Sequence, residues 1–244
     1  ITDAARVDEL VEMARVSKRP AWWTKYRHVF SPPFVSLLGY EASAAVIRHY
    51  HGGAVPALLQ TEDYARAVIA AHTADAGRID DLVSARMERQ ELLDREEPPT
   101  MHYILDEAVI RRWVGGPKVM RDQLAWLKEL ASRPGIDIRI VPFSAGTHPG
   151  MRGPFLIYEF PPDEDEDYIV FLESNRGHTL LRNETGEVSG YLDRFAELGE
   201  KATPADRLND VLDDAIADLD GRPGAGRAAV RREAPASDPA ADQT

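Results

Sequence analysis

Hydrophobic residues recur at helical spacing near the start of the chain. Val7, Leu10, Val11 and Ala14 stand at positions i, i+3, i+4 and i+7, which places them on one face of an α-helix. This spacing predicts an N-terminal helix that ends at Pro20, because proline is not accommodated in a helix interior.

The next segment is dense in aromatic side chains. Two consecutive prolines at positions 32 and 33 interrupt it, which predicts two short helices, one on each side of the break. The rings could pack against each other and against the core, or adjacent tryptophans could stack on a ligand; burial statistics favour packing. The aromatic residues are Trp22, Trp23, Tyr26, Phe30, Phe34 and Tyr40.

An alternating run with β-branched residues predicts a first strand over residues 44–50. Two helices follow it. Thr61 is the expected N-cap of the first, because a threonine hydroxyl accepts a hydrogen bond from the first helical turn. The second helix, over 79–97, is mostly polar, so we expect it at the surface or beside a polar cavity.

Strands and helices alternate after residue 100. A strand over 101–107, an amphipathic helix over 117–133 and a strand over 136–143 predict a crossover unit in one sheet. Thr203 is the expected cap of the last helix. The remaining predicted elements are three strands in an antiparallel meander and two helices, over 154–160, 168–174, 178–183, 184–201 and 204–219.

These elements predict an α+β fold. N-terminal helices pack on a mixed, mainly antiparallel sheet of about five to six strands, and further helices follow at the C-terminal end. Residues 1–220 form one regulatory domain in this prediction. Residues 221–244 are rich in Gly, Pro and Ala and poor in larger apolar residues, so we expect a disordered tail.

Composition narrows the possible classes of function. The 244 residues include 29 Lys and Arg against 41 Asp and Glu, a net charge of −12, which makes the chain by itself a poor partner for DNA. The absence of cysteine excludes disulfides, thiolate metal sites and cysteine nucleophiles. No apolar run reaches the length that crosses a membrane, so we expect a cytoplasmic protein with no membrane partner.

Sequence signatures of catalysis are missing. We find no GxSxG, SxxK or kinase motif, and no phosphate-binding GxxxxGK[ST] or GxGxxG loop. We therefore expect no enzymatic activity, no catalytic residue and no cofactor.

Two segments contain candidate metal ligands. His49 and His51 share a face of the first strand, but zinc requires three or four ligands and no fixed third ligand stands nearby. The five acids from Asp163 to Asp167 lack the glycine and the terminal glutamate of a calcium loop, which favours a solvated turn. We expect no metal site.

Polar residues at the ends of elements form the candidate binding site. Arginines on the 79–97 helix could face the carboxylates that end the 101–107 strand, giving either a salt-bridge network or a ligand pocket, and the sequence leaves both open. The glycine-rich segment 144–153 is expected to be a structured connection that brings a histidine to a cleft. The predicted ligand-binding residues, placed around one polar cleft, are Gln60, Glu62, Arg86, Arg89, Gln90, Asp106, Glu107 and His148.

Seven segments carry a resemblance to one family: WWTKY (22–26), GYEASAAVIRHY (39–50), VPALLQTEDYARAVI (55–69), RMERQELL (86–93), YILDEAVIRRWVGGPKVMRDQL (103–124), IRIVPFSAGTHPGMRGPFLIYEF (138–160) and VFLES (170–174). In this order they resemble the effector-like domain of unknown function that follows an Xre-type helix-turn-helix in actinobacterial, antitoxin-like transcriptional regulators. The resemblance implies that DNA-binding helices lie upstream of Ile1.

The resemblance implies a regulatory, sensing and dimerising domain. A small-molecule effector or a small partner protein would control DNA binding through the upstream helix-turn-helix. The alternative is an antitoxin-type interaction module that only neutralises a small partner protein, and it predicts no concave pocket. An enzyme is a third hypothesis, without support from any motif. Because helix-turn-helix regulators commonly read two half-sites, we expect a homodimer.

Overall fold

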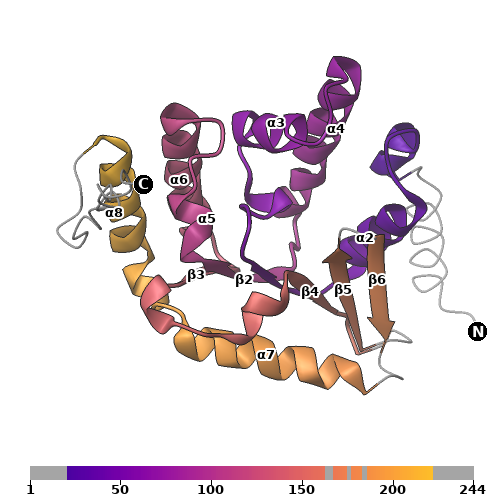
Figure 1. Cartoon of the computed structure of the whole chain (residues 1–244). Helices are drawn as coiled ribbons and strands as arrows, with labels where there is room; N and C mark the ends of the chain where they lie inside the picture. Colours follow the sequence, from indigo (N-terminus) through magenta and orange to yellow (C-terminus); the bar gives the residue numbers. More distant parts are fainter. Residues whose placement is uncertain (1–20, 163–166, 175–176, 183–185, 222–244) are drawn as a thin grey trace, which may run out of the picture.

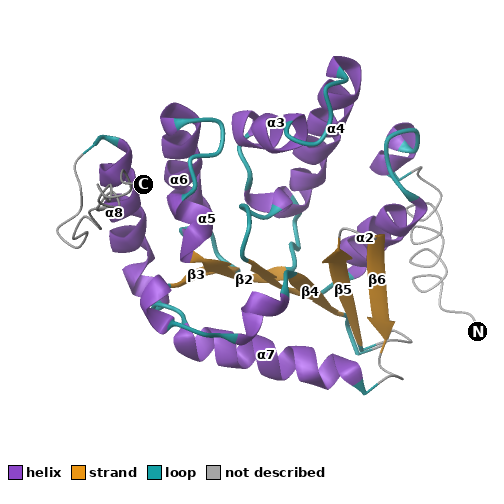
Figure 2. Ribbon diagram, in the orientation of Figure 1, coloured by secondary structure: helices purple, strands orange, loops and turns teal. Residues whose placement is uncertain are grey.

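A six-stranded mixed sheet forms the centre of the computed structural model, which describes residues 21–162, 167–174, 177–182 and 186–221 (Figures 1 and 2). The predicted α+β class is confirmed. In the order β3-β2-β1-β4-β5-β6 the sheet combines parallel and antiparallel pairs. The strands are β1 (Val46–His51), β2 (Thr100–Asp106), β3 (Ile136–Val141), β4 (Phe155–Glu159), β5 (Tyr168–Ser174) and β6 (Gly177–Arg182).

The two faces of the sheet are covered unequally. Among the described residues, α7 alone packs on one face and the other α-helices lie on the opposite side (Figure 1). The two short aromatic helices expected before the first strand are present as a 3₁₀ turn over Trp22–Tyr26 and as α2. The helices are α2 (Pro32–Ser43), α3 (Glu62–Ala70), α4 (Ala76–Arg89), α5 (Glu107–Arg111), α6 (Pro117–Ala131), α7 (Glu187–Lys201) and α8 (Leu208–Leu219).

Strand β1 joins the parallel and antiparallel halves of the sheet. It pairs in parallel with β2 and antiparallel with β4. The predicted crossover is confirmed, because β2 and β3 are parallel neighbours with α6 between them in the chain. Strands β4, β5 and β6 form the predicted meander, which extends the sheet from β1.

The segment that precedes α8 forms hydrogen bonds with the outer edge of β3. The Thr203 N–H donates to the Ile140 carbonyl at 2.7 Å, and the Thr203 hydroxyl accepts from the Ile140 N–H at 3.4 Å. The predicted capping role of Thr203 is therefore wrong. A 3₁₀ turn over Ala205–Arg207 separates it from α8, and its polar groups serve the strand instead.

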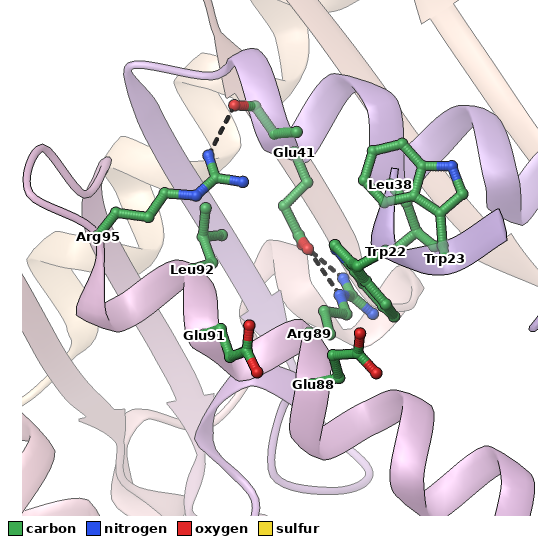
Figure 3. Close-up of a pocket in the computed structure, with 10 residues that line it drawn as sticks. Trp22, Trp23, Leu38, Glu41, Glu88, Arg89, Glu91, Leu92 and Arg95 are labelled. Atoms are coloured by element: carbon green, nitrogen blue, oxygen red, sulfur yellow. Dashed lines mark hydrogen bonds and ion pairs between the residues drawn. The ribbon is translucent and has the colours of Figure 1, made fainter. Parts of the chain in front are cut away.

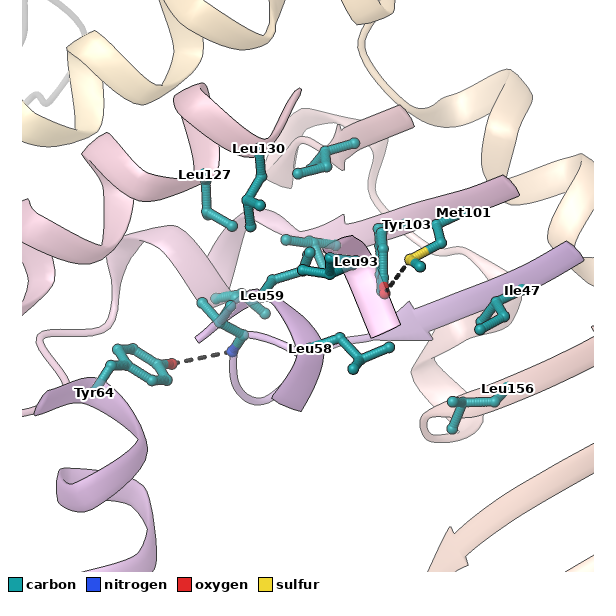
Figure 4. Close-up of a cluster of buried hydrophobic side chains, with 14 of the residues drawn as sticks. Ile47, Leu58, Leu59, Tyr64, Leu93, Met101, Tyr103, Leu127, Leu130 and Leu156 are labelled. Carbon is teal, nitrogen blue, oxygen red and sulfur yellow. Dashed lines mark hydrogen bonds between the residues drawn. The ribbon is translucent and has the colours of Figure 1, made fainter. Parts of the chain in front are cut away.

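Two hydrophobic clusters hold the layers together. The larger joins Ile47, Tyr103 and Leu156 of the sheet to Leu124 and Leu127 of α6, all of them buried (Figure 4). The smaller lies under α7 and contains Ile157, Val170 and Leu198. Because successive strand residues point to opposite faces, neighbouring positions such as Leu156 and Ile157 supply different clusters.

The predicted α3 and α4 pair is present, with one difference in length. Thr61 caps α3 as expected, its hydroxyl accepting from the Tyr64 N–H at 3.4 Å. Helix α4 ends at Arg89 instead of continuing to residue 97, and a 3₁₀ turn over Gln90–Asp94 follows. Both Leu92 and Leu93 are buried in this turn.

Three sequence predictions lie outside the described residues: the helix before Pro20, the acidic turn that begins at Asp163 and the tail after Gly221. Of the helices that the structure describes, none combines the length and apolar character needed to cross a membrane.

Candidate functional site

A cavity of about 480 Å³ lies between the helical layer and the middle of the sheet. We call it the central cavity. Its walls come from α2, β1, α3, α4, β2, β4 and β5 and from the loop after β1, and most of its lining residues are apolar. Examples of these apolar lining residues are Phe34, Val68, Leu156 and Phe171. A cavity of this size and character is typical of small-molecule sites.

A buried ion pair forms part of the polar lining. Arg89 of α4 donates from Nε and Nη2 to the two carboxylate oxygens of Glu41 in α2, at 2.7 and 2.5 Å (Figure 3). The side chains are only 10% and 4% exposed. Burial lowers the pKa of Arg89, but the charge and hydrogen bonds of Glu41 outweigh it, so the pKa is raised and the guanidinium stays charged.

Two glutamines connect this lining to the loop after β1. Arg86 donates to the Gln60 side-chain carbonyl at 2.7 Å, and the Gln60 amide donates to the Val55 carbonyl at 2.6 Å. The Gln90 amide donates to the carbonyls of Ala57 and Gln60. These contacts fix the loop against α4 and hold Arg86 at the cavity wall.

Two histidines of β1 face the central cavity. Their rings lie 5.7 Å apart, which confirms that His49 and His51 share a face of the strand. His51 Nδ1 accepts from the backbone N–H groups of Gly53 and Ala54, so the ring proton of neutral His51 is on Nε2. His49 is 9% exposed, and its Nε2 is buried without a hydrogen-bond partner. Among the described residues no group of three possible ligands could hold a metal ion.

We expect acidification to destabilise the protein through His49. Burial, followed by the positive charges of His51 and Arg89, holds the pKa of His49 well below its usual 6.5. The unfolded chain therefore gains a proton below about pH 6.5 that the folded chain does not bind, and stability falls as the pH falls. Between pH 7.5 and pH 5.5, urea unfolding should show a loss about 1.4 kcal/mol larger for the wild type than for His49→Gln. Equal losses in the two proteins would contradict the prediction.

Asp106 and His148 meet in a different place. His148 Nε2 lies 3.2 Å from Asp106 Oδ2, beside a hollow of about 320 Å³ at the end of β2. Asp106 Oδ1 also caps α5 by accepting from the Ala108 N–H at 2.8 Å. Burial and the Asp106 charge raise the pKa of Tyr50 in the same hollow to about 12. The expectation that the glycine-rich connection brings His148 to a cleft is confirmed.

The single polar cleft predicted from the sequence is therefore wrong. Gln60, Arg86 and Arg89 line the central cavity and Gln90 stabilises its wall, but Asp106 and His148 belong to the second hollow. Glu62 lies 3.5 Å from Arg66 on the surface, and Glu107 accepts from Arg111 and from the Phe143 N–H. Arg89 of α4 pairs with Glu41 of α2 and Arg86 donates to Gln60, whereas Asp106 lies beside His148 and Glu107 accepts from Arg111.

A family model described as "Domain of unknown function (DUF5753)" matches residues 34–214. The chain belongs to the DUF5753 family. The DUF5753 match contains every residue of the central cavity, from Phe34 to Phe171, whereas the 3₁₀ turn over Trp22–Tyr26 precedes it. No curated protein and no solved structure matches the chain.

Sequence reasoning missed two residues of this DUF5753 site. Glu41 stands four residues after Leu37 and three after Leu38, so its place on the buried stripe of α2 was a signal that it faces the core. His49 was considered only as a metal ligand. Its position between Ile47 and His51, on the face that packs against the helices, indicated a buried imidazole.

Proposed function

We propose that this DUF5753 domain is the sensing domain of an Xre-type helix-turn-helix transcriptional regulator that acts in the cytoplasm. A small molecule bound in the central cavity would control DNA binding by a module upstream of Ile1. The observation that carries the proposal is the cavity itself, whose lining combines mostly apolar residues with several polar side chains. The segments that resemble such regulators supply the DNA-binding part of the proposal.

The position of the cavity suits a sensor. Helix α2 contributes Phe34, Leu37 and Glu41 to the wall, so a ligand would contact the first described α-helix of the chain. The 3₁₀ turn before α2 rests on α4, where Tyr26 donates to Glu88 at 3.0 Å. A ligand that shifted α2 or α4 would therefore also shift the 3₁₀ turn that precedes α2. In the proposal, this turn lies on the side of the chain that leads to the DNA-binding module.

The alternative, an antitoxin-type module that only neutralises a small partner protein, fits the structure less well. It requires a docking surface and no concave site, and so provides no role for a cavity beside a buried imidazole nitrogen that has no hydrogen-bond partner. The enzyme hypothesis lacks a motif for a nucleophile, metal or cofactor, and we propose no catalytic residue.

The proposal is tested on the full-length product of the gene. Its binding to a fluorescent fragment of its own promoter is measured with and without a low-molecular-mass extract of the cells that produce it. We expect the extract to change the DNA affinity of the wild type. Val68→Trp, which fills the cavity from α3, should still bind DNA but lose this response. Ala70→Trp, at an exposed position of the same helix, is the matched control.

Two outcomes would overturn the proposal. The full-length protein could bind no DNA, or it could bind DNA equally with and without extract. A response that survives in Val68→Trp would place the sensing surface outside the central cavity.

The 244-residue chain alone is expected not to bind duplex DNA detectably at physiological salt. Its net charge of −12 repels phosphates, and sequence-specific binding requires the upstream module in our proposal. Fluorescence anisotropy with the same promoter fragment measures this. Submicromolar, sequence-specific binding by this chain would contradict the prediction.

The aromatic cluster at the N-terminal side, for which the sequence favours its own core and a dimer contact equally, is proposed here as the dimer contact. Trp22 and Trp23 pack edge to face at 5.6 Å, and both rest on the larger core while staying partly exposed. Trp22→Ala combined with Trp23→Ala is expected to convert a dimer into a folded monomer in sedimentation. Unfolding of the double variant would assign the rings to the core alone, and an unchanged dimer would exclude them from the interface.

A further inference from the structure

The charges along the central cavity are unlike those of the whole chain. The protein carries 41 acidic against 29 basic residues, yet the cavity lining contains one carboxylate, Glu41, and two guanidiniums, Arg86 and Arg89. Both oxygens of Glu41 accept from Arg89, and one also accepts from Tyr158 at 3.5 Å. Among the described residues, the only carboxylate of the lining is thus turned toward a protein cation, and a cationic ligand would have to approach two guanidiniums.

Hydrogen-bond donors are also concentrated in this lining. Arg86 and Arg89 stand one turn apart on α4, and a guanidinium has five N–H donors, one of which Arg86 gives to Gln60. His49 also lines the cavity, and its buried Nε2 has no hydrogen-bond partner among the described residues. A buried polar atom without a hydrogen bond is destabilising, so a ligand acceptor that reached this nitrogen would be stabilising.

The rest of the wall fits an apolar molecule. Phe34, Leu37, Ile47 and Leu156 present carbon surface to the same space, and the Arg89 guanidinium lies 5.4 Å from the centre of the Phe34 ring. The volume of about 480 Å³ is in the range of drug-sized ligands and too large for an inorganic anion alone.

We infer that the central cavity selects an organic anion that consists of an apolar body, aromatic or aliphatic, and one acid group. The acid group lies between Arg86 and His49, and the body fills the space beside Phe34 and Leu156. This inference rests on the proposed small-molecule site and names the chemical class of its ligand.

Two fluorescent probes of nearly equal shape test the inference. 8-Anilinonaphthalene-1-sulfonate carries one negative charge, and N-phenyl-1-naphthylamine is the same ring system without the sulfonate. Titration of the 244-residue chain is expected to give a single site for each probe, with the sulfonate bound at least about tenfold more tightly, since one charge-assisted hydrogen bond contributes about 1.5–3 kcal/mol. This comparison uses the wild type and so does not depend on the folding of a variant.

Variants then locate the selectivity. Arg86→Gln should weaken binding of the sulfonate about tenfold and change binding of the neutral probe less than about twofold. Arg112→Gln removes the same charge from an exposed position directly after α5, outside the cavity, and should change neither. Val68→Trp should weaken the binding of both probes. Far-UV circular dichroism verifies that each variant is folded.

The outcomes separate this inference from the proposed function. Equal affinities for the two probes, both lost in Val68→Trp, would overturn the anion selectivity and leave the small-molecule site standing. Binding of neither probe, or binding that Val68→Trp does not weaken, would remove the central cavity as a ligand site and overturn both. An equal effect of Arg112→Gln and Arg86→Gln would assign the selectivity to surface charge and overturn the inference.

Discussion

Replacing Glu41 by glutamine is expected to lower the free energy of unfolding by about 3–5 kcal/mol, the cost of leaving a buried charge without its partner. Arg89 would keep its charge inside the protein, with an amide where two carboxylate oxygens now accept its hydrogen bonds. The side chains are 10% and 4% exposed, so water replaces the lost contacts poorly. Urea unfolding followed by tryptophan fluorescence measures the change.

Two comparisons make this prediction specific. Asp122→Asn breaks the exposed ion pair between Lys118 and Asp122 and should change stability by less than about 1 kcal/mol. The combination of Glu41→Leu with Arg89→Met removes both charges, and it should be more stable than Glu41→Gln because no charge is left unpaired. If Glu41→Gln were as stable as the wild type, the pair could not be buried as the structure has it.

Gly150→Ala is expected to destabilise the protein by about 1–3 kcal/mol through overpacking. A Cβ atom at this position would lie 2.2 Å from Cζ of Tyr50. The Tyr50 ring is 2% exposed and lies between the rings of His148 and Phe155, so it cannot move away freely. Thermal unfolding should show a clear decrease in Tm.

Gly39→Ala is the matched control for that substitution. Gly39 lies inside α2, and a Cβ there would meet no atom within 4 Å. Alanine is preferred to glycine in a helix interior, so this variant should gain about 0.5–1 kcal/mol. A loss at both positions would indicate that steric contact with Tyr50 is not the cause.

Most of the fold follows from local sequence patterns. The alternation in β1 and the helical spacing of Met120, Leu124 and Leu127 indicate which side chains face the core, and all three residues of α6 are buried. Such patterns do not indicate the order of the strands in the sheet. A pattern shows that a strand has a buried face, but the same pattern allows β4 to pair with β1 or with β3.

The candidate site was only partly predictable for a related reason. Polar residues at helical spacing indicate Arg86 and Arg89, and a polar run at the end of an element indicates Gln60. Glu41, the partner of Arg89, lies 48 residues from it in the chain, and such a distant pair has no local signal. Asp106 was grouped with the arginines because it is acidic and ends a strand, although it binds His148 and caps α5.

The sheet order also has a consequence during synthesis. The β1 strand leaves the ribosome about a hundred residues before β4, its neighbour on one side, which at a translation rate of roughly 5–20 residues per second is a delay of roughly 5–20 s. Once β2 has emerged, about fifty residues after β1, β1 is the open edge of a parallel pair until β4 follows, and another nascent chain could pair there. Arg48, which later meets Glu159 of β4 at 2.6 Å, is a charged side chain on that strand, of the kind that disfavours such pairing.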